Sequence, residues 1–193
     1  MKTDSNSSSD RSALRQTFRS QRRALDANQQ RTAEAALAKQ GAALLSTFTR
    51  ITSYHPSDGE IHTGSLTKTL GGDVYLPVVN EHDEMTFVQH NPAIPLVEGR
   101  WGVMHPPLAT AEILDDLSAL DAMLIPLVAF DRNGSRLGRG GGFYDKILSV
   151  TPRRVLRIGL AHHFQEHSGL PEESWDQKLD LIITDRELID CRR

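Results

Sequence analysis

The sequence contains one cysteine among its 193 residues, Cys191, close to its end. A single cysteine excludes a disulfide framework and a cysteine-based metal site, and it is typical of proteins from a reducing compartment. The sequence also lacks any run of roughly 18 to 20 apolar residues, which a membrane helix would require. The first ten residues, MKTDSNSSSD, lack the apolar stretch of a secretory signal. We therefore expect a cytoplasmic protein that is neither exported nor inserted in a membrane.

The sequence has little excess charge, with a formal net charge of -3 at pH 7. This balance gives no general attraction to nucleic acid or to an anionic membrane, so any basic site must be local. The length and the 38% hydrophobic content suit one folded domain with its own core. We expect residues 1–10 to form a disordered polar tail and residues 11–193 to form a single domain.

The spacing of apolar residues predicts both helices and strands. Residues 11–48 lack proline and have a helical repeat, which predicts two helices with a break near Gly41. The apolar run at 122–130 is typical of a strand covered on both faces, which favours a mainly parallel sheet surrounded by helices. We expect strands at 50–55, 73–79, 85–90, 121–130, 154–162 and 179–185. The second and third of these form a hairpin, and a short helix starts at Ala111.

The segment GSRLGRGGGFYDKIL, residues 134–148, places five glycines beside two arginines, Arg136 and Arg139. It follows the most apolar strand and leads into a helix that begins near Phe143 or Tyr144. Glycines at such a turn let backbone approach an anion, and the helix N-terminus offers free N–H groups. The spacing matches neither a dinucleotide-binding loop nor a Walker loop. The alternative is a flexible turn in which Asp145 caps the helix.

A second basic element lies in the first predicted helix. Arg11, Arg15 and Arg19 recur every four residues and share one face, and Arg22 and Arg23 extend the row. Three interpretations are open from the residues alone: a solvated helix face, a nucleic-acid patch, or one wall of a polyphosphate site. The overall acidic balance weighs against nucleic acid.

The histidines of HHFQEH, residues 162–167, lack the order of a zinc-binding helix. We interpret them as ordinary polar side chains at a strand end.

The whole pattern of motifs resembles the 5-formyltetrahydrofolate cyclo-ligase family, also called 5,10-methenyltetrahydrofolate synthetase. The most specific motif is LIPLVAFDRNGSRLGRGGGFYDKIL at 124–148. The others follow in family order: RSALRQTFRSQRRAL (11–25), GEIHT (59–63), VYLPVV (74–79), RWGVMHPP (100–107) and LPEESWDQKLDLIITD (170–185). The resemblance implies a three-layer α/β/α fold like that of sugar-phosphate isomerases and CoA transferases (NagB/RpiA/CoA transferase-like). It also implies conversion of 5-formyltetrahydrofolate and ATP to 5,10-methenyltetrahydrofolate, ADP and phosphate with Mg²⁺.

The resemblance assigns roles to individual residues. The ATP-binding positions are Arg11, Arg15, Arg136, Leu137, Gly138, Arg139, Gly140, Gly141, Gly142, Phe143 and Tyr144. The folate-binding positions are His55, Glu60, Trp101, Arg139, Gly140, Gly141, Gly142 and Phe143. Arg139 and Tyr144 are the expected catalytic residues, and Asp145 and Asp176 are the expected Mg²⁺ ligands.

Four positions depart from the usual family pattern. Arg11 stands where lysine is common, Gly141 where many members have lysine, His55 where the residue is usually apolar, and His105 where glutamate is frequent. A non-catalytic folate or nucleotide binder is therefore the alternative to a cyclo-ligase. We expect a monomer whose partners are 5-formyltetrahydrofolate and ATP, with no nucleic acid and no membrane.

Overall fold

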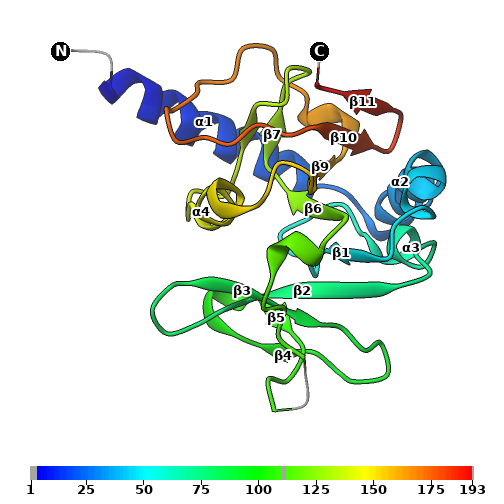
Figure 1. The fold of residues 1–193 in the computed structure, drawn as a ribbon. Coiled ribbons are helices and arrows are strands. Elements are labelled where there is room, and N and C mark those ends of the chain that lie inside the picture. The colour runs from blue at the N-terminus through cyan, green and yellow to red at the C-terminus, as the bar shows by residue number, and fades with distance from the viewer. Residues whose placement is uncertain (1–3, 110–111, 193) are drawn as a thin grey trace.

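A computed structural model describes residues 4–109 and 112–192 and contains a seven-stranded sheet with helices on both faces (Figure 1). In spatial order the strands are β11 (Leu188–Asp190), β10 (Leu181–Thr184), β9 (Leu156–Ala161), β6 (Ala122–Pro126), β1 (Arg50–Thr52), β2 (Asp73–Val79) and β3 (Met85–Gln89). The five inner strands are parallel, and both edge strands are antiparallel to their neighbours. The helices are α1 (Asp4–Arg23), α2 (Ala27–Leu45), α3 (Gly64–Thr67) and α4 (Phe143–Val150). Two small sheets pair β4 (Val97–Glu98) with β5 (Met104–His105) and β7 (Ala129–Phe130) with β8 (Arg136–Leu137).

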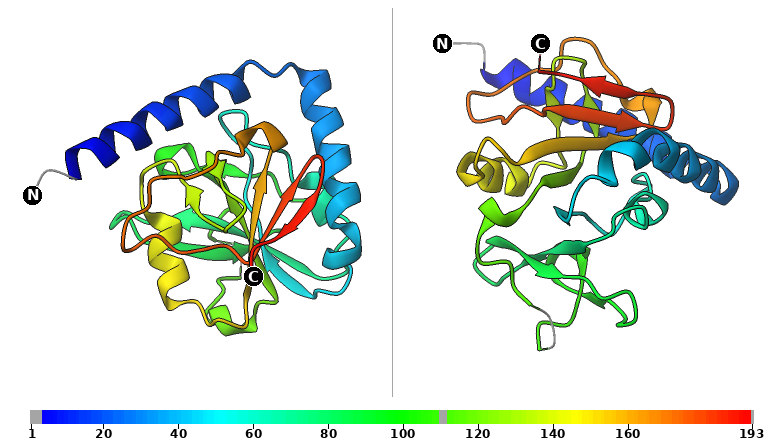
Figure 2. Two further views of the ribbon diagram at one scale, coloured as in Figure 1. Left: turned by 90° about the horizontal axis from the view of Figure 1, so that it is seen from above. Right: turned by 45° about the vertical axis from the view of Figure 1, so that its right-hand side comes forward.

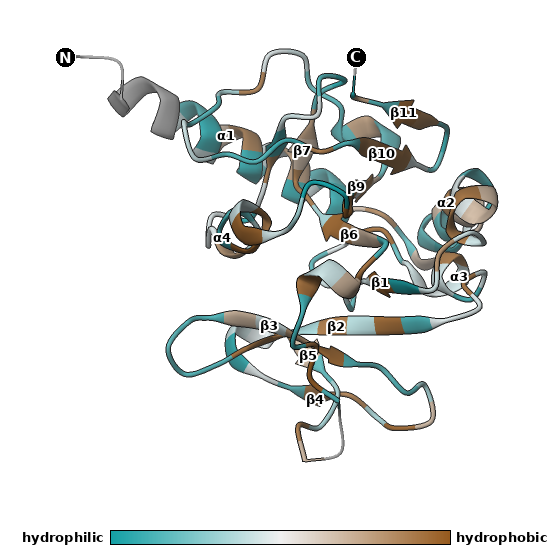
Figure 3. Cartoon of the chain, viewed as in Figure 1, coloured by the Kyte–Doolittle hydropathy of each residue, from teal (hydrophilic) through white to brown (hydrophobic). Residues whose placement is uncertain are grey.

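The alternation of side chains along β6 shows why the sheet is covered twice. Ala122 and Leu124 pack on one face with residues of α2 and α3, whereas Met123 and Ile125 pack on the other face with Leu148 of α4. All four β6 side chains are fully buried. Figure 3 accordingly shows β6, β9 and β10 mostly in the hydrophobic colour. The expected three-layer α/β/α fold with a mainly parallel sheet is confirmed.

The first two helices differ from expectation in where they begin and end. α1 begins at Asp4, so the predicted disordered tail at 1–10 is wrong for residues 4–10; residues 1–3 lie outside the described residues. The break between α1 and α2 falls at Asp26, whose side chain caps α2 in a capping box with Gln29. Gly41 lies inside α2, where a Cβ atom would come within 2.7 Å of Leu66. The glycine therefore allows close packing of α2 on α3 and does not end a helix.

Several strands were not predicted, and one predicted helix start lies outside the described residues. The run at 121–130 is two strands, because the chain leaves the main sheet after Pro126 and forms the β7–β8 hairpin. β11 and the β4–β5 pair were missed, since strands of two or three residues carry little periodicity. Ala111, the predicted start of a short helix, lies outside the described residues, and the following helix is a 3₁₀ turn at Leu117–Ala119.

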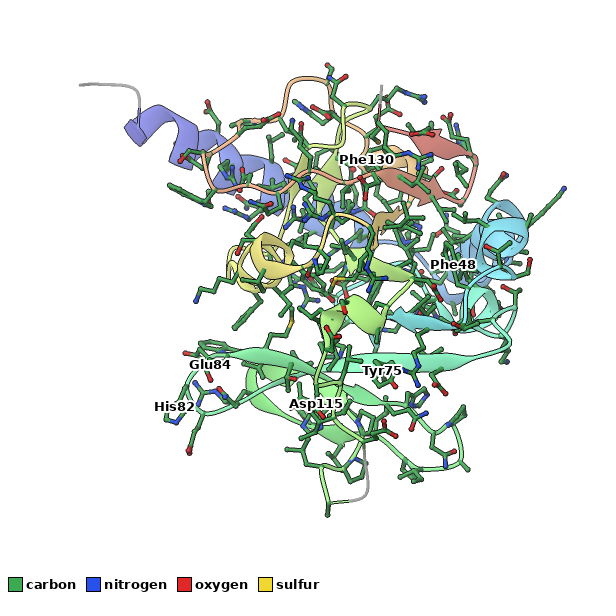
Figure 4. All side chains as sticks on the ribbon, viewed as in Figure 1. Phe48, Tyr75, His82, Glu84, Asp115 and Phe130 are labelled. Atoms are coloured by element: carbon green, nitrogen blue, oxygen red, sulfur yellow. The ribbon has the colours of Figure 1, made fainter. Side chains whose placement is uncertain are left out.

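α1 and α2 meet at an angle, and α4 lies across the sheet from α2 (Figure 2). Phe18 of α1 packs with the β7–β8 hairpin, including Leu137. The β2–β3 hairpin was predicted correctly, and its tip, with His82 and Glu84, projects from the body of the sheet (Figure 4). α1, the β7–β8 hairpin and this tip lie outside the main sheet, and each contributes residues to the walls of the site described next.

Candidate active site

A cleft with a volume of about 810 Å³ lies beside the carboxyl ends of β1, β2 and β6. This is the edge of a parallel sheet at which α/β proteins usually bind their ligands, and the volume is within the range of small-molecule sites. Of the predicted site residues, all except Leu137 line the cleft: Arg11, Arg15, His55, Glu60, Trp101, Arg136, Gly138, Arg139, Gly140, Gly141, Gly142, Phe143, Tyr144, Asp145 and Asp176. Leu137 is 1% exposed and packs in the core with Phe18. Its side chain therefore supports the hairpin and does not face a ligand.

The glycine-rich segment is two structures, not one strand-to-helix turn. Gly134 lies in the β7–β8 hairpin with φ of 82°, where a Cβ atom would come within 2.5 Å of the Leu179 carbonyl oxygen. Gly140 and Gly142 also have positive φ, 107° and 69°, and Gly142 caps the N-terminus of α4. Bare backbone is thus required at the start of α4, where unpaired N–H groups favour an anion. The predicted helix start at Phe143 is confirmed.

Arg139 joins the glycine loop to the segment that follows β1. Its Nε atom is 3.2 Å from Glu60 Oε1, and its Nη2 atom donates a hydrogen bond of 2.5 Å to Ser57 Oγ. Glu60 is 6% exposed. Burial raises the pKa of the Glu60 carboxyl, while Arg139 and the hydrogen bond from the Ser57 backbone oppose this rise. The arginine and the carboxylate therefore form one partly buried, charged unit in the cleft.

Two further arginines bind the predicted metal ligands. Arg136 Nη2 donates to Asp145 Oδ1 at 2.7 Å, and Arg11 Nη1 donates to Asp176 Oδ2 at 2.6 Å. Burial alone would raise the pKa of the Asp176 carboxyl, but the hydrogen bonds from Arg11 and the Glu173 backbone lower it overall. Each of the two carboxylates is therefore held by an arginine, and only Asp176 is held by a residue of α1.

Arg15 has a different environment from Arg11. Its Nε atom donates to the neutral carbonyl oxygen of Gly138 at 2.9 Å, and burial, with Arg11 as a second cause, lowers the pKa of Arg15. A partly buried guanidinium whose hydrogen bond goes to a neutral group is well suited to bind an incoming anion.

Aromatic side chains form the outer part of the cleft. Trp101 is 67% exposed, has a left-handed φ of 59°, and donates from Nε1 to Asp83 Oδ1 at 3.0 Å. Asp83 lies at the tip of the β2–β3 hairpin, and Trp175 enters the cleft from the segment before β10. A Cβ atom at Gly141 would come within 2.8 Å of the Phe143 ring, so the glycine lets this ring lie against the loop. Exposed flat rings are suitable surfaces for stacking a planar ligand.

The Tyr144 hydroxyl has no hydrogen-bond partner among the described residues, although it is buried. Burial raises the pKa of Tyr144, and the nearby Glu60 carboxylate raises it further. A neutral hydroxyl with an unused hydrogen bond can donate to a ligand that enters the cleft. His55 also lines the cleft, and burial, followed by His62, lowers its pKa.

Sequence reasoning did not assign several residues that line the cleft, among them the polar and aromatic side chains Ser57, Asp83, Lys146 and Trp175. Two signals were present. Ser57 stands three residues before Glu60, and Trp175 stands next to Asp176 in a motif already recognised. His105 does not line the cleft; its ring is buried and contacts the Pro106 carbonyl oxygen.

The segment HHFQEH forms no part of this cleft. His163, Glu166 and Glu187 have ligand atoms within 4.8 Å of one another. However, Arg132 donates to both carboxylates, at 2.9 Å and 2.5 Å, so a cationic side chain of the protein already binds the two acidic groups. Within residues 4–109 and 112–192, no helix is both long enough and apolar enough to span a membrane.

An open α/β sheet with arginines, carboxylates and flat rings at the carboxyl ends of its strands is the arrangement of an enzyme that binds an anionic, ring-containing substrate. A profile of the 5-formyltetrahydrofolate cyclo-ligase family matches residues 7–185, and the chain therefore belongs to this family. It is 35% identical over 182 residues to the 5-formyltetrahydrofolate cyclo-ligase of Haemophilus influenzae, which covers 90% of this chain and 97% of that protein. The corresponding protein of Escherichia coli K12 is also 35% identical, over 86% of this chain and 96% of its own length.

Solved structures give the same result. The 5,10-methenyltetrahydrofolate synthetase of Aquifex aeolicus superposes with a TM-score of 0.81 at 28% identity, over 95% of this chain and 93% of that one. The synthetase of Mycoplasma pneumoniae gives a TM-score of 0.74 at 26% identity, over 92% and 99%. The family resemblance inferred from the motifs is confirmed, and the chain is an enzyme of the cyclo-ligase class.

Proposed function

We propose that the protein converts 5-formyltetrahydrofolate and ATP to 5,10-methenyltetrahydrofolate, ADP and phosphate, with Mg²⁺ as cofactor. The observation that carries this proposal is the position of Arg139. It lies between the glycine loop at the N-terminus of α4 and the buried carboxylate of Glu60, which it contacts at 3.2 Å. One guanidinium can therefore reach the region suited to phosphate and the region suited to a pterin ring.

The ATP phosphates would bind along the glycine loop. Gly140 and Gly142 allow the backbone to approach them, and Arg15 and Arg139 supply positive charge from two sides. Arg11 of α1 also lines the cleft and would add positive charge near the phosphates, although it is paired with Asp176.

The carboxylates of the cleft fit a magnesium ion by their chemistry. Mg²⁺ prefers hard oxygen ligands and is usually bound by one or two carboxylates together with substrate phosphates. Asp145 accepts hydrogen bonds from Arg136 and the Gln177 backbone on the single atom Oδ1. Asp145 and Asp176 would hold the ion, which would neutralise negative charge on the phosphates when bound.

The folate would occupy the part of the cleft that contains Glu60. A carboxylate accepts hydrogen bonds in pairs, which suits the ring N–H groups of a reduced pterin. Trp101 and Phe143 would stack on flat parts of the substrate, and the unpaired Tyr144 hydroxyl would donate a hydrogen bond to it.

The chemistry needs positioning and charge stabilisation more than a nucleophilic side chain. The formyl oxygen attacks the γ-phosphorus of ATP and ADP leaves, which makes the oxygen a good leaving group. The 10-nitrogen then attacks the formyl carbon and loses its proton, and phosphate departs with the formyl oxygen, leaving the methenyl cation. Arg139 is placed to stabilise charge on the transferring phosphoryl group, as arginines do in other phosphoryl transfers.

Purified protein incubated with 5-formyltetrahydrofolate, ATP and Mg²⁺ should produce the methenyl compound, which is followed by its absorbance, with one ADP formed for each product. Folded protein that forms no product, or forms it without ATP, would contradict the proposal. Calorimetric binding of the folate without ADP release would instead identify a non-catalytic binder.

A further inference from the structure

The sequence Ser57-Asp58-Gly59-Glu60 forms a tight turn beside the cleft. The Glu60 backbone N–H donates to the Ser57 carbonyl oxygen at 3.0 Å, and the two central residues both have positive φ, 55° and 73°. Positive φ at both central positions defines a type I′ turn, for which Asp-Gly and Asn-Gly are the preferred pairs. A Cβ atom at Gly59 would come within 2.6 Å of the Arg22 carbonyl oxygen, so the turn packs directly against the end of α1.

Both ends of this turn hold Arg139. Ser57 accepts a hydrogen bond from Arg139 on its hydroxyl, and Glu60 accepts the ion pair. Ser57 also donates its backbone N–H to Glu60 Oε2 at 3.0 Å, which fixes the carboxylate within the turn. The position of the turn therefore sets the position of the charged unit on which the proposed reaction depends.

The side chain of Asp58 anchors the turn to α1. Its carboxylate accepts from Arg19 at 2.7 Å and from Arg22 at 3.2 Å, and it also binds Arg23. Burial alone would raise the pKa of the Asp58 carboxyl, but the hydrogen bonds from Arg23 and Arg19 lower it overall. A carboxylate shared by three arginines is more than an exposed ion pair, because Arg22 is fully buried.

The buried guanidinium of Arg22 donates to Asp58 at 3.2 Å, and Glu60 belongs to the same turn, which packs against Arg22 at Gly59. Burial lowers the pKa of Arg22, and the charges of Glu60 and Asp58 oppose this effect. An unpaired buried charge is costly, so Arg22 needs a carboxylate partner. While Asp58 is that partner, Arg22 attracts Glu60 less strongly than it would alone. Without the charge of Asp58, Arg22 would be balanced by Glu60 alone and would compete with Arg139 for it.

We propose that Asp58 is a positioning residue: by neutralising Arg22, it keeps the Glu60 carboxylate available to Arg139 and to the substrate. This inference rests on the proposed function, in which Glu60 binds the pterin. It assigns to a residue outside the cleft lining a specific effect on folate binding, with no direct effect on the nucleotide.

The substitution Asp58→Asn isolates the charge, because Asn-Gly is as well suited to the turn as Asp-Gly. It should raise the KM for 5-formyltetrahydrofolate by about tenfold, the effect of losing one charge-assisted hydrogen bond. The KM for ATP should rise less than the KM for the folate, because Arg139 keeps its hydrogen bond to Ser57. The matched control is Arg23→Ala, which removes an arginine that is 58% exposed and leaves Arg19 and Arg22 on Asp58; both KM values should stay within about twofold.

A second substitution tests the mechanism. Arg22→Met in the Asp58→Asn background removes the competing cation, and the folate KM should return towards that of the wild type. The Leu127 carbonyl oxygen, which accepts from Arg22, keeps its hydrogen bond from Gln165.

An unchanged folate KM in Asp58→Asn overturns the inference, as does an equal rise of both KM values that Arg22→Met does not reverse. If Asp58→Asn does not fold, Arg22→Met alone and the double variant decide: equal folate KM values support the inference, and a higher value in the double variant overturns it.

Failure of the proposed function gives a different result. A wild-type protein that binds 5-formyltetrahydrofolate but does not turn it over contradicts the reaction only. The same variants are then compared by their Kd for 5-formyltetrahydrofolate, measured from the fluorescence of Trp101 and Trp175, which line the cleft. A Kd that is unchanged in Asp58→Asn overturns the inference, and so does a wild-type protein that does not bind the folate.

Discussion

At the scale of single residues, Arg139 has the most direct test. The substitution Arg139→Ala removes a guanidinium of the glycine loop that lines the cleft, 3.2 Å from Glu60. We expect kcat/KM to fall by at least about tenfold, which corresponds to about 1.4 kcal/mol of transition-state stabilisation. Steady-state kinetics with both substrates measures the change. Arg31→Ala, at an exposed position of α2, is the control. Wild-type kinetics in Arg139→Ala would remove the residue from the site.

Asp145 is a second residue with a specific test. Asp145→Asn keeps a side chain that can accept a hydrogen bond from Arg136, but it removes the negative charge expected to bind the cation. The apparent affinity for Mg²⁺ should weaken by roughly tenfold or more, since metal sites lose at least that much when their supporting groups are changed. A magnesium titration at saturating ATP measures this, with Asp115→Asn, at an exposed position, as the control. An identical titration for wild type and Asp145→Asn would contradict the assignment.

The residues that sequence reasoning found and those it missed differ in how they reach the cleft. Arg139 and Glu60 belong to recognisable motifs, so their positions could be predicted without coordinates. The pairing of Arg11 with Asp176 could not, because it joins residues 165 positions apart through the folding of α1 against the segment before β10. Asp83 was missed for the same reason: it contacts Trp101 only because the β2–β3 hairpin and the loop after β4 lie together.

At the scale of elements, the turn at 57–60 links the site to the stability of the fold. Gly59→Ala should be destabilising, because φ is +73° and the new Cβ would lie 2.6 Å from the Arg22 carbonyl oxygen. We expect the free energy of unfolding to fall by about 1 to 3 kcal/mol. Gly71→Ala is the matched control, because nothing lies within 4 Å of its Cβ position; its effect should be below about 0.5 kcal/mol. Denaturant unfolding measures both, and equal stability of the two variants would contradict the role of the turn.

The elements that could be predicted are those with a clear repeat. β2 was predicted with its observed bounds, Asp73–Val79, because its apolar residues end at turn-forming residues. The β7–β8 hairpin was not, since an uninterrupted apolar run does not show where a chain leaves one sheet for another. Gly41 was read as a helix break, although its role is to let α2 approach Leu66. A glycine inside a helix thus has two meanings that only tertiary contacts distinguish.

At the scale of the whole molecule, His162 connects the sheet, the turn at 57–60 and the pH dependence of stability. The ring follows β9, is 2% exposed, and lies with Nε2 3.2 Å from the Gly59 carbonyl oxygen. Burial lowers the pKa of His162, although the contact with Gly59 partly opposes this. The folded protein therefore holds the ring neutral at a pH where the unfolded chain protonates it.

The sign of the effect follows from proton binding. An unfolded histidine titrates near about pH 6.5, and the folded pKa of His162 is lower. The stability contributed by the neutral ring is complete above that pH and is lost as the pH falls towards the folded pKa, at up to about 1.4 kcal/mol for each pH unit.

His162→Gln, which keeps an N–H donor for Gly59, should flatten the decrease in stability between about pH 7 and about pH 5.5. His82→Gln, at the exposed tip of the β2–β3 hairpin, should leave the decrease unchanged. Denaturant unfolding at a series of pH values measures the slope, and the same slope in wild type and His162→Gln would show that His162 does not couple the fold to pH.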